Sequence, residues 1–217
     1  MKILKKLLLI FNFIPALLIT SCYEYFSYII SEKNNLNEGI SPLKNFPVFE
    51  KNSLIKKGLK YTTFIKDVYD GDTFTDKNNR HFRLFGIDTP ELQLHRPNPK
   101  INPKLMKFHG LRAKKILQDF IWNRWISFEI VNIDNYNRIV VIIENESGEN
   151  LNLKMVERGF AINRYSQYEN PKKNYYYPEH KNLIDRLRNA QEKAKKANLL
   201  LWNDGILPIY GINSYTK

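Results

Sequence analysis

The sequence contains little cysteine and little histidine, and this scarcity limits the kinds of site it can hold. Cys22 is the only cysteine among 217 residues, so no disulfide can form within the chain. The four histidines show no metal-ligand spacing, and we assign them no role; they are His81, His95, His109 and His180. The composition excludes a disulfide framework and gives no sign of a histidine-based metal site.

The apolar stretch at the N-terminus is short, and its length decides how we interpret it. Residues 7–19 are apolar apart from one asparagine and one proline, and lysines precede them. A membrane-spanning helix needs about 20 apolar residues, so the stretch is typical of a signal-peptide core instead. The run Ile19-Thr20-Ser21-Cys22 then resembles the bacterial lipoprotein box, whose cysteine is lipidated and becomes the mature N-terminus.

We therefore predict a signal peptide over residues 1–21 and a lipid anchor at Cys22, which would hold the protein on the extracytoplasmic face of the cell membrane. One alternative is an ordinary cleaved signal, which would leave the protein secreted. Another is an uncleaved N-terminal anchor. Residues 22–57 lack sustained periodicity and contain Gly39, Pro42 and Pro47, so they predict a flexible tether.

Acidic residues are outnumbered by basic ones, 22 against 34, which gives a formal net charge of +12. Removing residues 1–21 takes away lysines but no acidic residue and leaves +9, so the basic character belongs to the mature protein. Such a surplus indicates a polyanionic partner, either nucleic acid or an anionic membrane. A generally cationic secreted protein is the alternative.

The hydrophobic pattern predicts five strands, with one helix inserted between the third and the fourth and further helices after the fifth. Apolar periodicity predicts strands at 61–68, 73–76, 80–87, 125–130 and 138–144, and helices at 104–123, 151–158 and from Pro178 onward. In the third strand, Phe82 and Leu84 share one face and Arg83 points to the other. This order predicts an α+β fold that is mainly a β-barrel, a five-stranded Greek-key barrel of the OB type over residues 58–205, with a C-terminal tail at 206–217. Spacing alone does not distinguish it from another α+β fold.

Two acidic clusters are the main candidate functional motifs of the sequence. The first is Asp70-Gly71-Asp72-Thr73 and the second is Asp88-Thr89-Pro90-Glu91, with Arg83 between them. Asp134-Asn135-Tyr136-Asn137-Arg138 follows further along the chain. Carboxylates bind a divalent cation, and guanidinium groups bind a phosphate through two-point contacts. The combination indicates a site that holds a cation against a phosphodiester.

Taken in order, these motifs resemble the thermonuclease, or staphylococcal-nuclease-like, family over about residues 61–202. The resemblance rests on five motifs: V-Y-D-G-D-T at 68–73, F-R-L-F-G-I-D-T-P-E at 82–91, D-N-Y-N-R at 134–138, N-L-K-M-V-E-R-G-F-A at 152–161, and L-L-L-W before Asn203. It implies an OB barrel with about three helices and phosphodiesterase activity.

The residues of these motifs then receive roles. Asp72, Asp88 and the backbone carbonyl of Thr89 would hold the metal, and such hard oxygen ligands favour Ca²⁺. The resemblance implies that Glu91 is the general base or positions the attacking water. Arg83 and Arg138 would bind the phosphate and stabilise the transition state. The alternatives are a surface loop group for Glu91 and surface salt bridges for the arginines. Asp70 is either a nearby acid or a turn carboxylate bonded to its own backbone.

Two tyrosines match positions where the family packs phenols near the nucleotide, Tyr136 and Tyr165, and stacking there would tolerate many bases. The sequence departs from the family in two places. Asn135 stands where the best-known member has a basic residue, which predicts a weaker phosphate contact. The next aromatic after Tyr165 is Tyr168, which is one residue further along than expected. The sequence therefore does not determine which residue completes the base-stacking wall.

Together these features predict a membrane-anchored, calcium-dependent nuclease that hydrolyses DNA and RNA with little sequence preference. The resemblance implies cleavage of the 5′ P–O bond with 3′-phosphate products. We expect a monomer, because nothing in the sequence implies a protein partner. The alternatives are a non-catalytic OB module that binds nucleic acid and a surface adhesin or structural lipoprotein whose charge binds polyanions.

Overall fold

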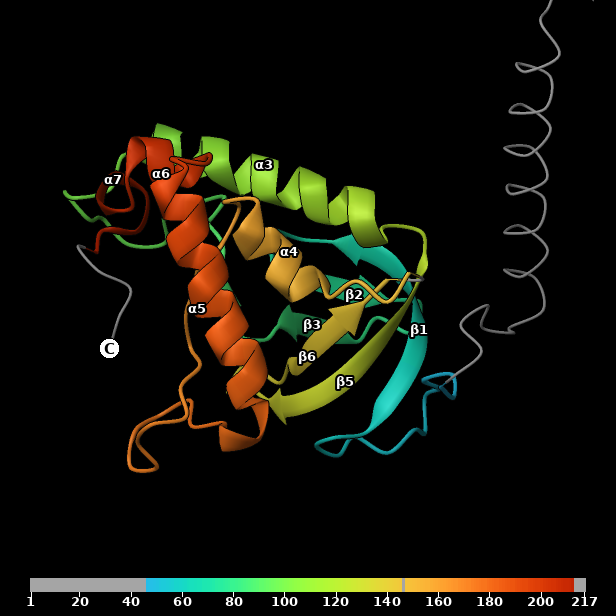
Figure 1. The fold of residues 1–217 in the computed structure, drawn as a ribbon. Helices are drawn as coiled ribbons and strands as arrows, with labels where there is room; N and C mark the ends of the chain where they lie inside the picture. Colours follow the sequence, from blue (N-terminus) through green and yellow to red (C-terminus); the bar gives the residue numbers. More distant parts are fainter. Residues whose placement is uncertain (1–45, 146, 213–217) are drawn as a thin grey trace, which may run out of the picture. The chain divides into compact units, whose positions relative to one another are not determined.

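The computed structural model describes residues 46–145 and 147–212, which form a closed five-stranded barrel (Figure 1). Its strands are β1 (Lys60–Val68), β2 (Thr73–Asp76), β3 (His81–Leu84), β5 (Trp125–Ile133) and β6 (Ile139–Glu144). They are neighbours in the order β1-β2-β3-β6-β5. Only β3 and β6 pair in parallel among these strands of the described chain. The predicted α+β fold, a mainly β-barrel of five strands, is confirmed.

Helices cover the barrel along the top and the left side of Figure 1. They are α3 (Pro103–Ile121), α4 (Leu151–Glu157), the 3₁₀ turn η2 (Pro178–His180), α5 (Lys181–Lys196), α6 (Leu201–Asp204) and α7 (Leu207–Tyr210). None of the helices formed by residues 46–145 and 147–212 is both long enough and apolar enough to cross a bilayer. The predicted signal peptide and Cys22 lie outside the described residues.

The helix ends follow local chemistry. The Asn102 side chain accepts hydrogen bonds from the backbone N–H groups of Lys104 and Leu105 at 3.1 and 3.2 Å, and Pro103 occupies the first turn. The helix therefore begins one residue before the predicted start. The last long helix differs more, because Pro178 opens a separate 3₁₀ turn and α5 begins only at Lys181.

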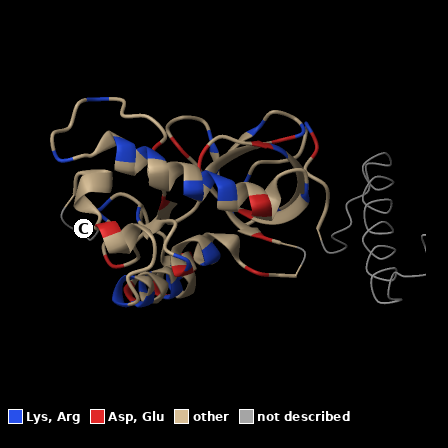
Figure 2. Cartoon of the chain, turned by 90° about the horizontal axis from the view of Figure 1, so that it is seen from above, with Lys and Arg blue, Asp and Glu red and all other residues tan. Residues whose placement is uncertain are grey.

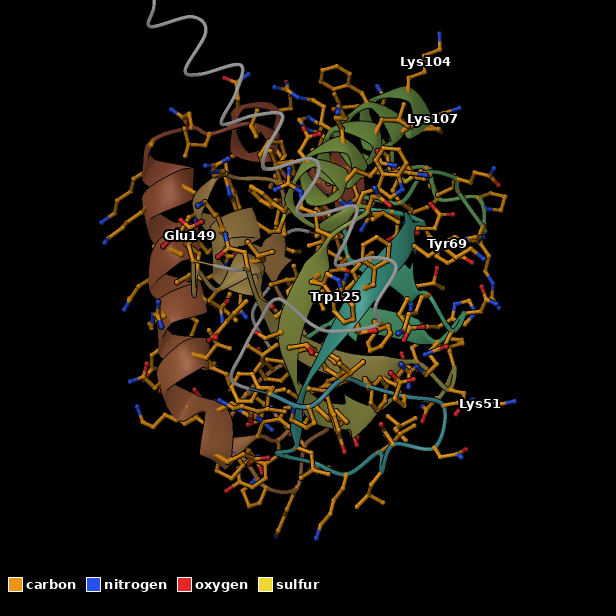
Figure 3. The ribbon with its side chains drawn as sticks, turned by 90° about the vertical axis from the view of Figure 1, so that its right-hand side faces the viewer. Lys51, Tyr69, Lys104, Lys107, Trp125 and Glu149 are labelled. Carbon is orange, nitrogen blue, oxygen red and sulfur yellow. The ribbon has the colours of Figure 1, made fainter. Side chains whose placement is uncertain are left out.

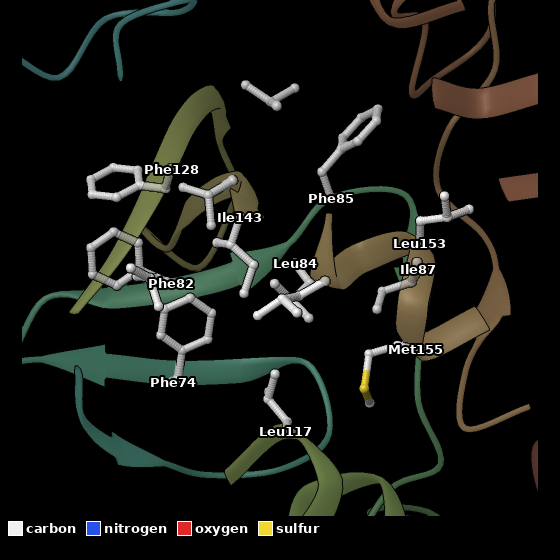
Figure 4. Packing of buried hydrophobic residues seen from close by; sticks show 14 of the residues in the cluster. Phe74, Phe82, Leu84, Phe85, Ile87, Leu117, Phe128, Ile143, Leu153 and Met155 are labelled. Atoms are coloured by element: carbon white, nitrogen blue, oxygen red, sulfur yellow. The ribbon is translucent and has the colours of Figure 1, made fainter. Parts of the chain in front are cut away.

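Aromatic side chains fill the barrel interior (Figure 4). The rings of Phe74 and Phe82 stack with centroids 5.3 Å apart, and Phe128 meets Phe82 edge-on. On β3, Phe82 and Leu84 are buried and Arg83 between them is half-buried, as the alternation predicted. The strand therefore packs one face into the core and leaves Arg83 for the opposite side.

The packed part of the chain extends beyond both ends of the 58–205 segment. Phe49 is fully buried, and its ring contacts those of Tyr61 and Phe128. The end of the predicted tether is thus a part of the fold. At the other end, Ile206 and Ile209 are buried against a small cluster around Trp202, so residues 206–212 pack on the domain.

A second, two-stranded sheet brings a distant part of the chain next to the second acidic motif. β4 (Ile87–Asp88) pairs antiparallel with β7 (Ile162–Asn163), and Asp88 lies opposite Ile162. This pairing brings the residues that follow β7 beside Asp88, although they are more than seventy residues away in sequence.

Candidate active site

Arg83 lies between the two acidic motifs. Its neighbour across the β2–β3 pair is Thr73, which directly follows Asp72. The Arg83 guanidinium forms an ion pair with Asp72 and donates from Nη2 to Asp88 Oδ1 at 2.8 Å. Both aspartates are buried, at 1% and 7% exposure. Buried carboxylates need such partners, so the three side chains form one charged cluster.

Thr89 completes the surroundings of Asp72. Its backbone N–H and its hydroxyl both donate to Asp72 Oδ2 at 2.9 Å. Gly71 allows this loop to approach α3, because a Cβ at that position would lie 2.5 Å from Ala113 Cβ and 2.8 Å from Thr89 Cβ. The first acidic motif therefore needs glycine at this position for close packing.

Arg138 reaches the same cluster from the β5–β6 turn. Asp134 accepts from the Arg138 backbone N–H at 2.9 Å and from Nε at 2.7 Å, which fixes the side chain. Partial burial acts to raise the pKa of Asp134, but these hydrogen bonds outweigh it and the pKa is lowered. The Arg138 Nη1 group lies 3.4 Å from the hydroxyl of Thr73. Asp134 therefore positions Arg138, a role that the sequence did not reveal.

Asp70 has the geometry of a turn carboxylate. Its Oδ1 accepts from the backbone N–H groups of Asp72 and Thr73 at 2.9 and 2.7 Å. Burial raises the pKa of Asp70, against the opposing effects of Arg83 and the hydrogen bonds from Thr73. The turn alternative thus describes the contacts of Asp70, and the same carboxyl also adds negative charge beside the site.

Glu91 is exposed at the surface, and the charged groups of the cluster act on it. Partial burial, followed by the charges of Asp70 and Asp88, raises the pKa of Glu91, while Arg83 and His95 lower it. A carboxyl with a raised pKa is a better proton acceptor, provided that it is ionised. Glu91 therefore has the electrostatic setting of a candidate base.

Sequence reasoning missed Arg164. Its Nη1 donates to Asp88 Oδ2 at 2.9 Å, so Asp88 lies between two guanidinium groups. Burial acts to lower the pKa of Arg164, but the negative charge of Asp88 outweighs this effect, and the pKa is raised. No spacing in the sequence links these two residues. Only the β4–β7 pairing brings them together.

Tyr210 was also missed, because it falls in the segment predicted as a tail. Its hydroxyl donates to the backbone carbonyl of Asp88 at 2.9 Å. Burial, together with the charge of Asp88, raises the pKa of Tyr210 well above its usual value. The phenol therefore stays neutral, and its hydrogen bond joins the C-terminal segment of the chain to the end of β4.

The two predicted stacking tyrosines lie beside the arginines of the cluster. The ring of Tyr136 is 81% exposed, with the Arg138 guanidinium 5.2 Å from its centroid. Arg164 lies 4.8 Å from the ring centroid of Tyr165, whose φ of 59° is in the left-handed region. Tyr175 supplies the neighbouring ring at 5.1 Å. The sequence did not single out Tyr175.

Tyr168, the sequence neighbour considered for the stacking wall, takes part in a different network. Its hydroxyl donates to Asp185 at 2.6 Å, and Arg188 lies over its ring. Asn135 lies at the exposed tip of the turn between Asp134 and Tyr136. It supplies no cation there.

The donor atoms suit a hard cation. In the part of the chain that the structure describes, no group of three or more His, Cys, Asp or Glu side chains is arranged to hold a metal ion. Asp72 and Asp88 bring carboxylate oxygens to one place, because Arg83 contacts both. Carboxylate oxygens are ligands that Ca²⁺ prefers. With only two carboxylates, further ligands would have to come from backbone, water or phosphate.

Comparison with known protein families gives one relevant match. The sequence model described as Staphylococcal nuclease homologue matches residues 81–204, more than half of the chain. The matched span contains Arg83, Asp88, Glu91, Arg138 and Arg164, while Asp72 precedes it. Comparison with curated proteins finds no relative that matches this chain.

Proposed function

The chain belongs to the staphylococcal nuclease homologue family, and from that premise we propose that it is a calcium-dependent nuclease that hydrolyses phosphodiester bonds in DNA and RNA. The observation that carries the proposal is the contact of one guanidinium, Arg83, with both Asp72 and Asp88. Arg138 and Glu91 stand beside this cluster. A purely structural ion pair does not need two further charged groups at its edge.

The arginines would bind the phosphate. Guanidinium groups make two-point contacts with phosphate oxygens and keep their charge at all relevant pH values. Arg83 lies on β3 and Arg138 in the β5–β6 turn, and each is held by an aspartate, so their positions are set before substrate arrives. They would stabilise the additional negative charge on the phosphate oxygens in the transition state.

Glu91 would take the proton of the attacking water. Its raised pKa favours this step, because base strength increases with pKa as long as the carboxylate is ionised. By resemblance, water attacks phosphorus in line and the 5′ P–O bond breaks. The leaving 5′ oxygen takes up a proton from solvent, so the products are a 3′-phosphate and a 5′-hydroxyl. Asp72, Asp88 and the Thr89 carbonyl would hold Ca²⁺, which would supply positive charge to the phosphate.

The tyrosines would contribute binding without sequence preference. Tyr136 and the pair Tyr165–Tyr175 present exposed rings beside Arg138 and Arg164. Stacking on such rings tolerates every base. The basic surface would attract the polyanion through counterion release, so binding should weaken steeply as salt increases.

A plasmid assay tests the activity. The purified full chain is incubated with circular DNA or with RNA in Ca²⁺ or in EDTA, beside the Glu91→Gln variant. Calcium-dependent degradation that Glu91→Gln abolishes supports the nuclease. Retarded but intact DNA supports a non-catalytic binder, and the absence of both cleavage and retardation supports an adhesin or structural lipoprotein.

We also propose that the protein is a monomer anchored through lipidated Cys22 on the extracytoplasmic face of the membrane. The support is the sequence pattern around Cys22. Cell fractionation without detergent tests it. The anchored protein should sediment with membranes, and Cys22→Ala should release it. An unchanged distribution of the variant would refute lipidation.

A further inference from the structure

The outer face of α3 and its C-cap residue Trp122 expose large apolar side chains. Phe108, Leu111 and Trp122 are 50%, 49% and 56% exposed. The opposite face of the same helix is buried and already provides its packing through Met106, Ala113, Leu117 and Ile121. A helix that buries one face normally carries polar residues on the other. The exposed apolar groups therefore need another explanation.

Positive charges flank these apolar side chains along the same exposed face. We call this face the α3 stripe; it consists of Lys104, Lys107, Phe108, Leu111, Arg112, Lys115, Asp119 and Trp122. Figure 2, which looks down on α3, shows Lys and Arg segments along most of the helix. Asp119 is the single acid of the stripe, and it pairs with Lys115 at 2.5 Å. The stripe thus keeps a net positive charge.

Two contacts hold the aromatic groups of the stripe in place. The Arg112 guanidinium lies 5.3 Å from the ring centroid of Phe108. The Trp122 Nε1 donates to the backbone carbonyl of Lys66 at 3.2 Å, so the polar atom of the indole has a partner while the ring stays exposed. Phe108, Leu111, Ile116 and Phe160 line a shallow hollow of about 410 Å³, to which the charged side chains Arg112, Lys115 and Asp119 also contribute. The stripe therefore combines apolar and charged side chains around one preformed hollow.

We propose that the α3 stripe rests on an anionic lipid surface. Helices that lie in a membrane interface combine large apolar residues with flanking Lys and Arg, and tryptophan is enriched at that depth. The lysines and Arg112 would meet lipid phosphates, while Phe108, Leu111 and Trp122 enter the boundary of the acyl chains. A nucleic-acid surface would account for the cations but not for a half-exposed leucine among them.

The orientation of α3 is compatible with an open active site. Gly110 lies on the buried face of the helix, where a Cβ would come within 2.7 Å of the Pro90 carbonyl and 2.9 Å of the Glu91 carbonyl. The stripe faces away from this contact. Lipid bound to the stripe therefore leaves Glu91 accessible, and the inference does not depend on whether the protein is a nuclease.

Tryptophan quenching by brominated lipids tests the proposal. The full chain is reconstituted in vesicles of phosphatidylcholine alone or mixed with phosphatidylglycerol, with bromine on the acyl chains. Of the three tryptophans, Trp125 and Trp202 are buried, so Trp122 is the reporter. We expect stronger quenching in the anionic vesicles. Trp122→Phe should remove this difference, which assigns the signal to the stripe.

A charge-matched pair of variants provides the control. Lys104→Glu with Lys107→Glu should reduce the quenching in anionic vesicles to its level in neutral ones. Lys51→Glu with Lys56→Glu makes the same change of charge at exposed positions, and Figure 3 shows Lys51 at the opposite end of the domain from Lys104 and Lys107. This control should quench like the unmodified chain. Far-UV circular dichroism verifies that all variants are folded.

Three results would overturn the proposal: equal quenching in neutral and anionic vesicles, equal loss in both lysine variants, or unchanged quenching in Lys104→Glu with Lys107→Glu. If that last variant instead loses retention of duplex DNA, the stripe is a nucleic-acid surface. Glu91→Gln should retain the lipid signal in full. The failure of the lipid contact and the failure of the proposed nuclease activity can thus be told apart.

Discussion

Arg164 and Asp88 form an ion pair of 2.9 Å across the small β4–β7 sheet, and Arg83 binds the other oxygen of the same carboxylate at 2.8 Å. Asp88 is therefore held by two cations from different parts of the chain. Any cation that binds Asp88 must compete with them or be repelled by them. Arg164 would thus lower the affinity of the calcium site that we propose here.

Removing Arg164 tests this relationship. In Arg164→Gln, we expect Ca²⁺ to bind up to about fivefold more tightly in the absence of nucleotide, because a partly exposed ion pair contributes about 0–1 kcal/mol. Titration calorimetry measures the affinity. Arg188→Gln is the matched control, because it removes an arginine that pairs with Glu169 outside the site. Unchanged or weaker calcium binding in Arg164→Gln would contradict the expectation.

Arg138 should matter for rate more than for binding to the ground state. Arg138→Gln should decrease kcat by about 10²–10³, as expected for the loss of one preorganised donor to the transition state. Steady-state kinetics on a defined oligonucleotide measure the change, with Arg188→Gln again as the control. A decrease of less than about threefold would indicate that Arg138 has a structural role in the turn, where it pairs with Asp134, and no catalytic role.

Glu91 should destabilise the folded protein at neutral pH. Burial and the charges of Asp70 and Asp88 raise the pKa of Glu91 above its value in the unfolded chain. The contribution of Glu91 to the free energy of unfolding is therefore most favourable when Glu91 is protonated, below the unfolded pKa of about 4.3. This contribution is lost as pH rises through the folded pKa. Urea unfolding in EDTA should thus show Glu91→Gln to be more stable than the unmodified chain at pH 7, and the gain should disappear toward pH 3. Equal stability at pH 7 would mean that the carboxylate is fully solvated.

The charge of Asp70 should be visible in the pH dependence of activity. Asp70→Asn keeps an oxygen that can accept from the backbone of Asp72 and Thr73 but removes a negative charge that raises the pKa of Glu91. The acid limb of kcat/KM should therefore move to lower pH. Measurement of kcat/KM across the acid range checks this. A shift to higher pH would indicate that Glu91 is not the group that controls the limb.

Tyr210 should contribute to the stability of the site from the C-terminal side. Tyr210→Phe leaves the Asp88 carbonyl without its phenol donor, and we expect a loss of about 0.5–1.5 kcal/mol in the free energy of unfolding. Tyr69→Phe is the matched control, because that ring is exposed and stacks on His81. Urea denaturation of both variants makes the comparison. Equal effects would show that the hydrogen bond to Asp88 contributes nothing specific.

Local patterns predicted much of the fold. Alternation along β3 placed Phe82 and Leu84 inside and Arg83 outside, and the structure has them so. Local patterns did not predict the boundaries of the packed domain, because Phe49 and Ile209 lie in segments whose composition is typical of a tether and a tail. Their burial depends on contacts with distant strands and helices. Periodicity does not reveal such contacts.

The sequence by itself determined the order of the strands and helices, the family, and the clustering of Asp72, Arg83 and Asp88. These three residues are close in the chain: Asp72 directly precedes β2, Arg83 lies on β3, and Asp88 ends β4 a few residues later. Only the tertiary structure decided that Arg164 pairs with Asp88, that Tyr210 holds the backbone of Asp88, and that Tyr175 packs beside Tyr165. The physical reason is chain separation. Contacts between residues far apart in sequence are set by the pairing of β4 with β7 and by the packing of the C-terminal helices, and no local spacing encodes them.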